Sequence, residues 1–183
     1  MTLLEAINDI LQQCGEAPIS TSEGTLPPEA EIVQRCISQA AVSLCCLPHS
    51  FNVVTKETLP ADTNGHVYVP SDTLSVLLED ANASLRGNEI KTTGDDLPYG
   101  EPAKVIRRII SIPFEKLPSY AMSLVQWSAA ISAYTPVTGS ENVPDSIVRL
   151  LQQARLVFLR NERAATQPNA LGNRGATRRP IGR

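Results

Sequence analysis

The stretch LLEAINDILQQCG, residues 3–15, predicts the first element of the fold. Its apolar residues recur at the i, i+3, i+4, i+7 spacing of a helix that buries one face. They are Leu3, Leu4, Ile7, Ile10, Leu11 and Cys14. Gly15 follows at the position where a glycine commonly ends a helix. We therefore predict a helix over about residues 2–14, packed through this face against other helices.

Two further segments repeat this helical pattern. A second helix is predicted over about residues 28–47, since Pro28 suits a helix start and Pro48 ends it. A third helix is predicted over about residues 118–134 and is rich in alanine and serine, small residues that let helices approach closely. Thr135-Pro136 and Gly139 are expected to break this third helix. The chain should therefore contain a bundle of helices.

The last part of the chain changes in composition after one more helix. The spacing predicts this fourth helix over about residues 143–163. Its apolar face is expected to comprise Ile147, Leu150, Leu151, Ala154, Val157 and Phe158. From Ala164 onward Gln, Asn, Gly, Pro and Arg replace the apolar residues, so nothing there can pack a core. We expect residues 164–183 to be disordered or extended in the isolated protein.

Residues 51–112, between the second and third helices, favour β-structure. Asn64-Gly65 is a strong hairpin signal, and Arg86-Gly87-Asn88 indicates a second turn. Short strands are expected at residues 51–59, 66–69 and 74–78, around Leu85 and Ile90, and at residues 105–112. The predicted fold class is α+β, mainly a helical bundle with a small antiparallel β-region inserted, in one domain of residues 1–163.

The charge of the chain is unevenly distributed. Residues 160–183 carry six arginines against one glutamate, a net charge of +5, so the other residues sum to −8. Three hypotheses account for the arginine-rich C-terminal arm, residues 164–183. It is a solubilising loose end, a segment that becomes ordered when it binds a protein partner, or a nucleic-acid-binding tail. Its candidate partner-binding residues are Arg174, Arg178, Arg179 and Arg183.

The residues that carry most enzyme chemistry are sparse and scattered. His49 lies beside a proline turn and His66 at a hairpin, neither in a recognisable nucleophile motif. The four cysteines form no C-x-x-C pair and no histidine stands at metal-ligand spacing, so buried reduced thiols are expected. Neighbouring carboxylates such as Glu79-Asp80 point to opposite faces of a strand and indicate solvated turns. We predict no metal, no cofactor and no enzymatic activity.

The sequence also indicates where the protein is made. No stretch approaches the roughly 18 uninterrupted apolar residues of a membrane span. The acidic Glu5 and Asp9 stand where a signal peptide would carry positive charge. We therefore expect a soluble protein that is made inside the cell.

Several short motifs resemble one protein family. Their residues occur at the start of the chain, after the second helix and before the third helix. They are Ala6–Leu11, Gly15-Glu16, Pro18, Ser20-Thr21, Glu23-Gly24, Phe51-Asn52, Leu59-Pro60, Val67–Asp72 with Leu74, and Phe114–Pro118. This set resembles the tail tubular protein A family, the head-to-tail adaptors of short-tailed bacteriophages. The chain departs from the family pattern at Pro48-His49-Ser50, where a Gly-Trp pair often stands.

The resemblance implies a structural virion protein. It implies a helical bundle with an inserted β-region, assembled as a twelve-fold ring between the portal protein and the tail nozzle protein, with DNA passing through the centre without specific binding. The family-motif residues carried over are Asn8, Asp9, Gly15, Glu16, Pro18, Glu23 and Gly24. The alternative function is a small nucleic-acid-binding protein that uses the basic arm, and this alternative requires an affinity that falls steeply with salt.

Overall fold

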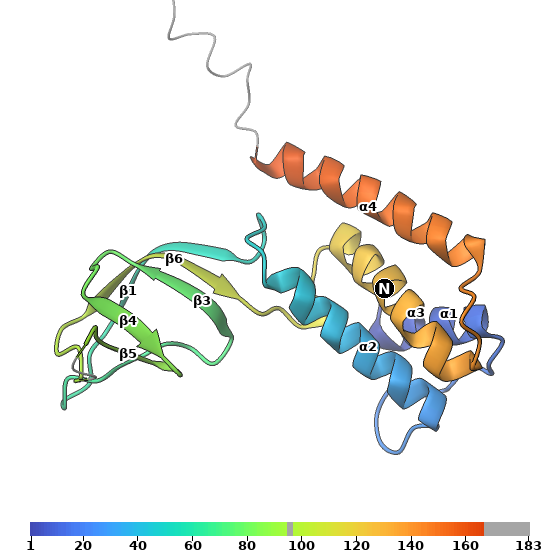
Figure 1. Cartoon of the computed structure of the whole chain (residues 1–183), viewed down its shortest axis with the longest axis horizontal. Coiled ribbons are helices and arrows are strands. Elements are labelled where there is room, and N and C mark those ends of the chain that lie inside the picture. The colour runs from blue at the N-terminus through green and yellow to red at the C-terminus, as the bar shows by residue number, and fades with distance from the viewer. Residues whose placement is uncertain (95–96, 167–183) are drawn as a thin grey trace, which may run out of the picture.

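The computed structural model describes residues 1–94 and 97–166. Within these residues the chain forms a helical lobe and a β-lobe, which lie side by side along the long axis of the molecule (Figure 1). The helical lobe contains α1 (Leu3–Cys14), α2 (Pro28–Cys45), α3 (Ser119–Thr138) and α4 (Asp145–Thr166). The β-lobe contains β1 (Val53–Leu59), β2 (Val67–Tyr68), β3 (Thr73–Leu78), β4 (Ala83–Arg86), β5 (Glu89–Thr92) and β6 (Ala103–Ile110). A short 3₁₀ helix, η1 (Phe114–Lys116), lies between β6 and α3.

The mixed α+β class is confirmed, but a mainly helical bundle is not supported. Helices hold 45% of the residues and strands 20%. The β-region consists of two small antiparallel sheets and has a hydrophobic core of its own. That core contains Leu59, Val67, Val69, Ile90, Ala103 and Val105, all buried. The chain therefore builds two cores, one in each lobe.

Both ends of α1 are fixed by local interactions. The Thr2 hydroxyl accepts the backbone N–H of Glu5 at 3.2 Å, and the Glu5 carboxylate accepts the N–H of Thr2 at 2.7 Å. This capping box satisfies two of the free donors that every helix start leaves. At the other end Gly15 adopts a left-handed conformation with φ 82°. The helix thus begins after Thr2 and ends before Gly15 for reasons that are local in sequence.

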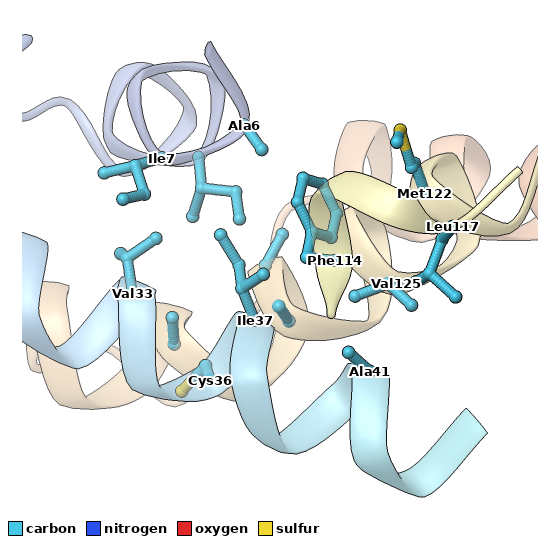
Figure 2. Close-up of a cluster of buried hydrophobic side chains, with 14 of the residues drawn as sticks. Ala6, Ile7, Val33, Cys36, Ile37, Ala41, Phe114, Leu117, Met122 and Val125 are labelled. Carbon is cyan, nitrogen blue, oxygen red and sulfur yellow. The ribbon is translucent and has the colours of Figure 1, made fainter. Parts of the chain in front are cut away.

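The core of the helical lobe lies between α1, α2 and α3. Figure 2 shows Ile7 on α1 across from Val33 on α2, with Phe114 of η1 beside Ile37. Ile7, Val33 and Ile37 have no solvent-exposed surface. The alanines of α3 are buried as well, and α3 packs against α1, α2 and α4. The small residues of α3 therefore allow close packing within one chain.

The helix α3 runs past the point where the sequence predicted its end. It continues through Thr135-Pro136 to Thr138, and Gly139, with φ 70°, ends it. Pro136 lies in the last turn, where it removes one backbone hydrogen bond and leaves the preceding turns intact. The predicted break at Gly139 is confirmed, whereas the predicted break at Thr135-Pro136 is wrong. The other helices also differ from the expected bounds at their ends, since α2 stops at Cys45 and α4 continues to Thr166.

The strands form two sheets instead of one. One sheet has the order β1-β6-β3 and the other β2-β5-β4, with all neighbours antiparallel. Asn64-Gly65 does form a tight turn, in which the Asp62 carboxylate accepts the N–H groups of Asn64 and His66, both at 2.8 Å. The two strands flanking this turn belong to different sheets, so the predicted hairpin is wrong. Pairing of β1 with β6 prevails because Leu59 pairs with Ala103, and both are buried in the β-lobe core.

The helix α4 packs on α3 through a narrower face than the sequence predicted. Ile147, Ala154 and Phe158 are buried, whereas Val157 is 49% exposed. Val157 lies at the margin of the apolar face, about 100° around the helix from Phe158, because each residue turns an α-helix by about 100°. The inclusion of Val157 in the buried face is therefore wrong.

Candidate interaction surfaces

One asparagine joins the helical lobe to the β-lobe. The Asn52 side chain is fully buried, and its amide donates to the carbonyls of Cys45 at 2.8 Å and Leu47 at 3.0 Å. Its carbonyl accepts the N–H of His49 at 2.7 Å. The Asn52 backbone carbonyl accepts the N–H of Ile110 on β6. Asn52 thus satisfies free carbonyls at the end of α2 and fixes the direction in which β1 leaves.

A buried arginine holds the β1-β6-β3 sheet together. Arg108 on β6 is 7% exposed and donates to both carboxylate oxygens of Glu57 on β1, at 2.8 and 3.3 Å. Its guanidinium also donates to Asp72 at 2.9 Å and to the Thr73 hydroxyl at 3.2 Å. The flat guanidinium satisfies two acceptors at once because its donors form a fork. Arg108 therefore links the central strand to both of its neighbours.

Replacing Arg108 with methionine is expected to lower the free energy of unfolding by about 2 kcal/mol. The loss stays below that of a fully buried ion pair because Glu57 and Asp72 are partly solvated, with side chains 29% and 48% exposed. Urea unfolding followed by circular dichroism measures it. As a control, Arg86→Met removes an exposed arginine on β4 and should change stability by less than about 0.5 kcal/mol. Equal effects of the two substitutions would contradict the role of Arg108.

The C-terminal half of α4 is attached through Glu162. Its carboxylate accepts the Ser50 N–H at 2.9 Å, the Ser50 hydroxyl at 2.8 Å and the Tyr120 hydroxyl at 3.0 Å. His49 lies 3.8 Å from the same carboxylate and packs against Phe158. Burial raises the pKa of Glu162, but the hydrogen bonds from Ser50 and Tyr120 and the nearby His49 outweigh it and lower that pKa. The Pro48-His49-Ser50 segment, where the chain departs from the family pattern, thus holds α4 in place.

A lowered pKa of Glu162 predicts a pH-dependent attachment. The stabilisation is present above the pKa of a glutamate in the unfolded chain, about 4.5, and is lost as the pH falls through the lower pKa of the folded state. Glu162→Gln should lower the free energy of unfolding at neutral pH by about 2 kcal/mol and flatten its acid dependence. Thermal unfolding at a series of pH values measures both effects. Glu141→Gln, at an exposed loop position, is the matched control and should retain the wild-type acid dependence.

An open groove separates α2 from α4. It has a volume of about 470 Å³, with Leu44 and Leu47 on the α2 side, Leu124 and Ser128 of α3 in its floor, and Arg155 of α4 on its rim. α2 and α4 both pack on α3, and α4 runs along the outside of the helical lobe (Figure 1). Leu47, at the end of α2, is 62% exposed. The groove combines an apolar wall with one cation, a composition that suits a protein partner.

The outer face of α4 is also unusually apolar. Leu156 is 69% exposed and Leu159 is 50% exposed, and both lie among exposed arginines of the same helix. Single exposed leucines need no explanation, but two on one short helix face form a patch of the kind that marks contact sites. Sequence periodicity missed this patch, although the positions of Leu156 and Leu159 outside the i, i+3, i+4 pattern were a usable signal.

Three of the family-motif residues make local contacts or shape the backbone in the helical lobe. The Asn8 amide donates to the carbonyl of Ile19 at 3.0 Å and its carbonyl accepts the Ile19 N–H at 2.8 Å, so Asn8 holds the loop after α1 against the helix. Asp9 accepts a hydrogen bond from Gln126 of α3 at 2.8 Å, and Gln126 is buried. Gly15 ends α1 with its left-handed conformation. These three residues support the fold of the helical lobe.

The remaining motif residues lie in the loop between α1 and α2. Gly24 adopts a left-handed conformation with φ 82°, and the Thr21 hydroxyl accepts the N–H of Glu23 at 3.1 Å. Glu16, Pro18 and Glu23 are exposed. The motif residues Asn8 to Gly24 thus lie on α1 and in the loop that follows it. The partner-binding candidates Arg174, Arg178, Arg179 and Arg183 lie outside the described residues.

Titratable groups in the described part of the chain are paired or dispersed. Residues 1–94 and 97–166 contain no group of three His, Cys, Asp or Glu residues able to hold a metal ion.

All four cysteines are free thiols, of which Cys36 and Cys45 are buried and Cys46 is exposed. Burial raises the pKa of the Cys36 thiol. His66 lies against Glu89 in the β-lobe.

Within residues 1–94 and 97–166, no helix combines the length and apolarity that crossing a bilayer requires.

The fold and these surfaces define a protein whose exposed features suit contacts with other proteins: an apolar groove and an apolar helix face. The sequence matches the family model described as "Tail tubular protein" over residues 4–168, which include both lobes, and the chain belongs to this family. A search of curated proteins found no match. The family consists of structural proteins of the bacteriophage tail that are in general not enzymes, and membership places the protein in the virion.

Proposed function

We propose that this protein is the adaptor of a short-tailed bacteriophage, a ring-forming subunit that joins the portal to the tail nozzle. The family match over residues 4–168 carries this proposal, because it includes the whole described fold. The exposed groove beside α2 and the apolar outer face of α4 support it, since a ring subunit must bury surfaces against neighbours that a monomer leaves exposed. DNA passes through the centre of the ring without specific binding.

The ring has the twelve-fold symmetry that the resemblance implies, and the portal and nozzle proteins are its partners. Residues 1–163 act as the adaptor domain. The arginine-rich arm, residues 164–183, attaches to the portal through Arg174, Arg178, Arg179 and Arg183, because arginine suits directed contacts with carboxylates and carbonyls. An arm of about 20 residues spans up to about 70 Å when extended, enough to reach a neighbouring ring.

Mixing the purified chain with the portal protein of the same phage tests the adaptor function. Co-sedimentation at a defined stoichiometry, with an added ring visible beneath the portal in negative stain, is the expected result. No added ring density at saturating protein would contradict the function. Tight binding to duplex DNA that weakens steeply with salt would favour the nucleic-acid-binding alternative instead.

Removing residues 164–183 is expected to leave a folded monomer that binds the portal more weakly. The reason is that the composition changes from helix-forming and apolar to polar and basic at Ala164, so the arm adds contacts without adding core. Thermal unfolding and portal co-sedimentation of the truncated and full-length chains measure the two effects. Unchanged portal affinity after truncation would exclude the arm as an attachment segment.

A further inference from the structure

We propose that the outer face of α4 docks onto the outer face of α1 in a second copy of this chain. The idea rests on the proposed ring-forming function and names the two surfaces that meet between neighbouring subunits. Each surface is exposed in the single chain, and the two carry opposite charge. The contact is therefore one between copies of the same molecule.

The outer face of α4, called here the basic stripe, combines arginines with an exposed leucine. Its members recur at the i, i+4, i+7, i+11, i+14 spacing that places residues on one side of a helix. They are Arg149, Gln153, Leu156, Arg160 and Arg163, all exposed. The opposite side of α4, with Ala154 and Phe158, is buried against the rest of the helical lobe. The basic stripe thus faces away from the chain's own core.

The outer face of α1, called here the acidic stripe, has the complementary charge. Glu5, Asp9 and Gln12 follow the i, i+4, i+7 spacing, Glu16 lies just beyond the helix end, and all four are exposed. Residues 1–34 contain six acidic residues and no lysine or arginine. Two of the carboxylates are held in place, Glu5 by the Thr2 capping box and Asp9 by Gln126. The acidic stripe is therefore a fixed feature of the surface.

The two stripes have comparable lengths and lie on separate helices of one chain. At 1.5 Å per residue, residues 149–163 span about 21 Å and residues 5–16 about 16 Å. α1 and α4 each pack against α3, so neither stripe can fold back onto the other. Two different surfaces that complement each other form a head-to-tail contact, and such a contact builds either a closed ring or an open filament. This contact geometry is the one a ring subunit requires.

A protein partner accounts for the basic stripe better than nucleic acid does. Leu156, 69% exposed, lies between Arg149 and Arg160, and burying it requires an apolar or aliphatic surface. Phosphate contacts would leave this leucine in water. The acidic stripe offers carboxylates for the arginines, and the stems of Glu5 and Gln12 offer aliphatic surface for the leucine. Charge complementarity of this kind selects the partner and fixes how it is oriented.

Charge exchange in the full-length chain tests the contact. One variant, Arg149→Glu with Arg160→Glu, makes both stripes acidic. A second variant, Gln12→Arg with Glu16→Arg, brings the net charge of the acidic stripe from −3 to 0 and leaves the internal contacts of Glu5 and Asp9 intact. The first variant alone should self-associate about a hundredfold more weakly than wild type, since like charges then face each other across the contact. The second variant alone should self-associate about tenfold more weakly, since the attraction between the stripes is lost. An equimolar mixture should restore association, because the unchanged acidic stripe of the first variant then meets the unchanged basic stripe of the second.

Sedimentation velocity at high protein concentration and low salt measures association, and circular dichroism confirms that each variant is folded. Arg86→Glu with Arg107→Glu makes the same charge change at exposed positions of the β-lobe and should leave association unchanged. Wild-type protein that stays monomeric, variants that associate like wild type, or a mixture no better than its components would each overturn the contact. Binding of wild-type protein to duplex DNA that the first variant loses would assign the basic stripe to nucleic acid and overturn it too.

The same variants separate this contact from the adaptor function. If the first variant assembles on the portal as complete a ring as wild type does, the α1–α4 contact is excluded and the adaptor function stands. If wild-type protein itself fails to bind the portal, the adaptor function is excluded. Portal binding by wild type with incomplete rings from both variants, and complete rings from their mixture, is the expected result.

Discussion

Replacing Asn52 with alanine is expected to lower the free energy of unfolding by about 3 kcal/mol. The substitution removes the three hydrogen bonds of a fully buried side chain. The carbonyls of Cys45 and Leu47 and the N–H of His49 then lose the partner that Asn52 provides. Buried polar groups that lose their partner cost far more than the bond itself contributes. Chemical unfolding followed by far-UV circular dichroism measures the loss.

Two further asparagine variants sharpen this experiment. Asn52→Asp keeps the shape but places a carboxylate oxygen against the carbonyls of Cys45 and Leu47, so it should be at least as destabilising as Asn52→Ala. Asn142→Ala, at an exposed position before α4, should change stability by less than about 0.5 kcal/mol. A loss below about 1 kcal/mol for Asn52→Ala would show that the joint between the lobes does not depend on this side chain.

Replacing Ile37 with alanine is expected to lower the free energy of unfolding by about 3 kcal/mol. Ile37 has no exposed surface and lies in the middle of α2, facing α1 and η1 (Figure 2). The loss comprises the transfer of the removed methyl and methylene groups to water and the cavity that they leave. The same unfolding measurement applies, with the midpoint and the slope of the transition both recorded.

Val42→Ala is the matched control on the same helix. Val42 is 45% exposed, so truncating it removes little buried surface and should cost less than about 0.5 kcal/mol. If Ile37→Ala and Val42→Ala had equal effects, the core of the helical lobe would not be centred on the α1–α2 contact. An unchanged slope for both variants would show that the unfolded chain exposes the same surface.

The helices could be predicted from the sequence because their causes are local. Apolar spacing on α1 and the glycine after it place the helix within one or two residues of where the structure has it. Strand pairing could not be predicted, because β1 pairs with β6 across more than 40 residues and the turn at Asn64-Gly65 does not decide the partner. The break predicted at Pro136 was wrong because a proline in the last turn of a helix removes only one backbone hydrogen bond.

The polar residues that hold the lobes together could be predicted only in part. Asn8, Asp9, Gly15 and Asn52 stood in motifs of the family resemblance, but the motifs did not say what these residues contact. Glu162 could not be found, because its partner Ser50 lies 112 residues away in the sequence. Side-chain partners at such separations follow from the tertiary fold, which periodicity does not specify.

The exposed surfaces could likewise be predicted only in part. The overall charge asymmetry of the chain was visible in its sequence, and the arginines of α4 belong to it. Which of these arginines share a face with Leu156 became clear only when the bounds of α4 and its buried side were known. The surface that we assign to a neighbouring copy therefore required both the sequence and the fold.

Cryo-electron microscopy of the intact virion, at a resolution that separates helices from sheets, tests the adaptor function most directly. The adaptor function predicts a ring of two-lobed subunits directly beneath the portal and above the nozzle. Each subunit should be fitted by α1–α4 at one end and by the two sheets at the other. A tail in which this chain occupies any other position, or in which portal and nozzle meet without it, would contradict the account.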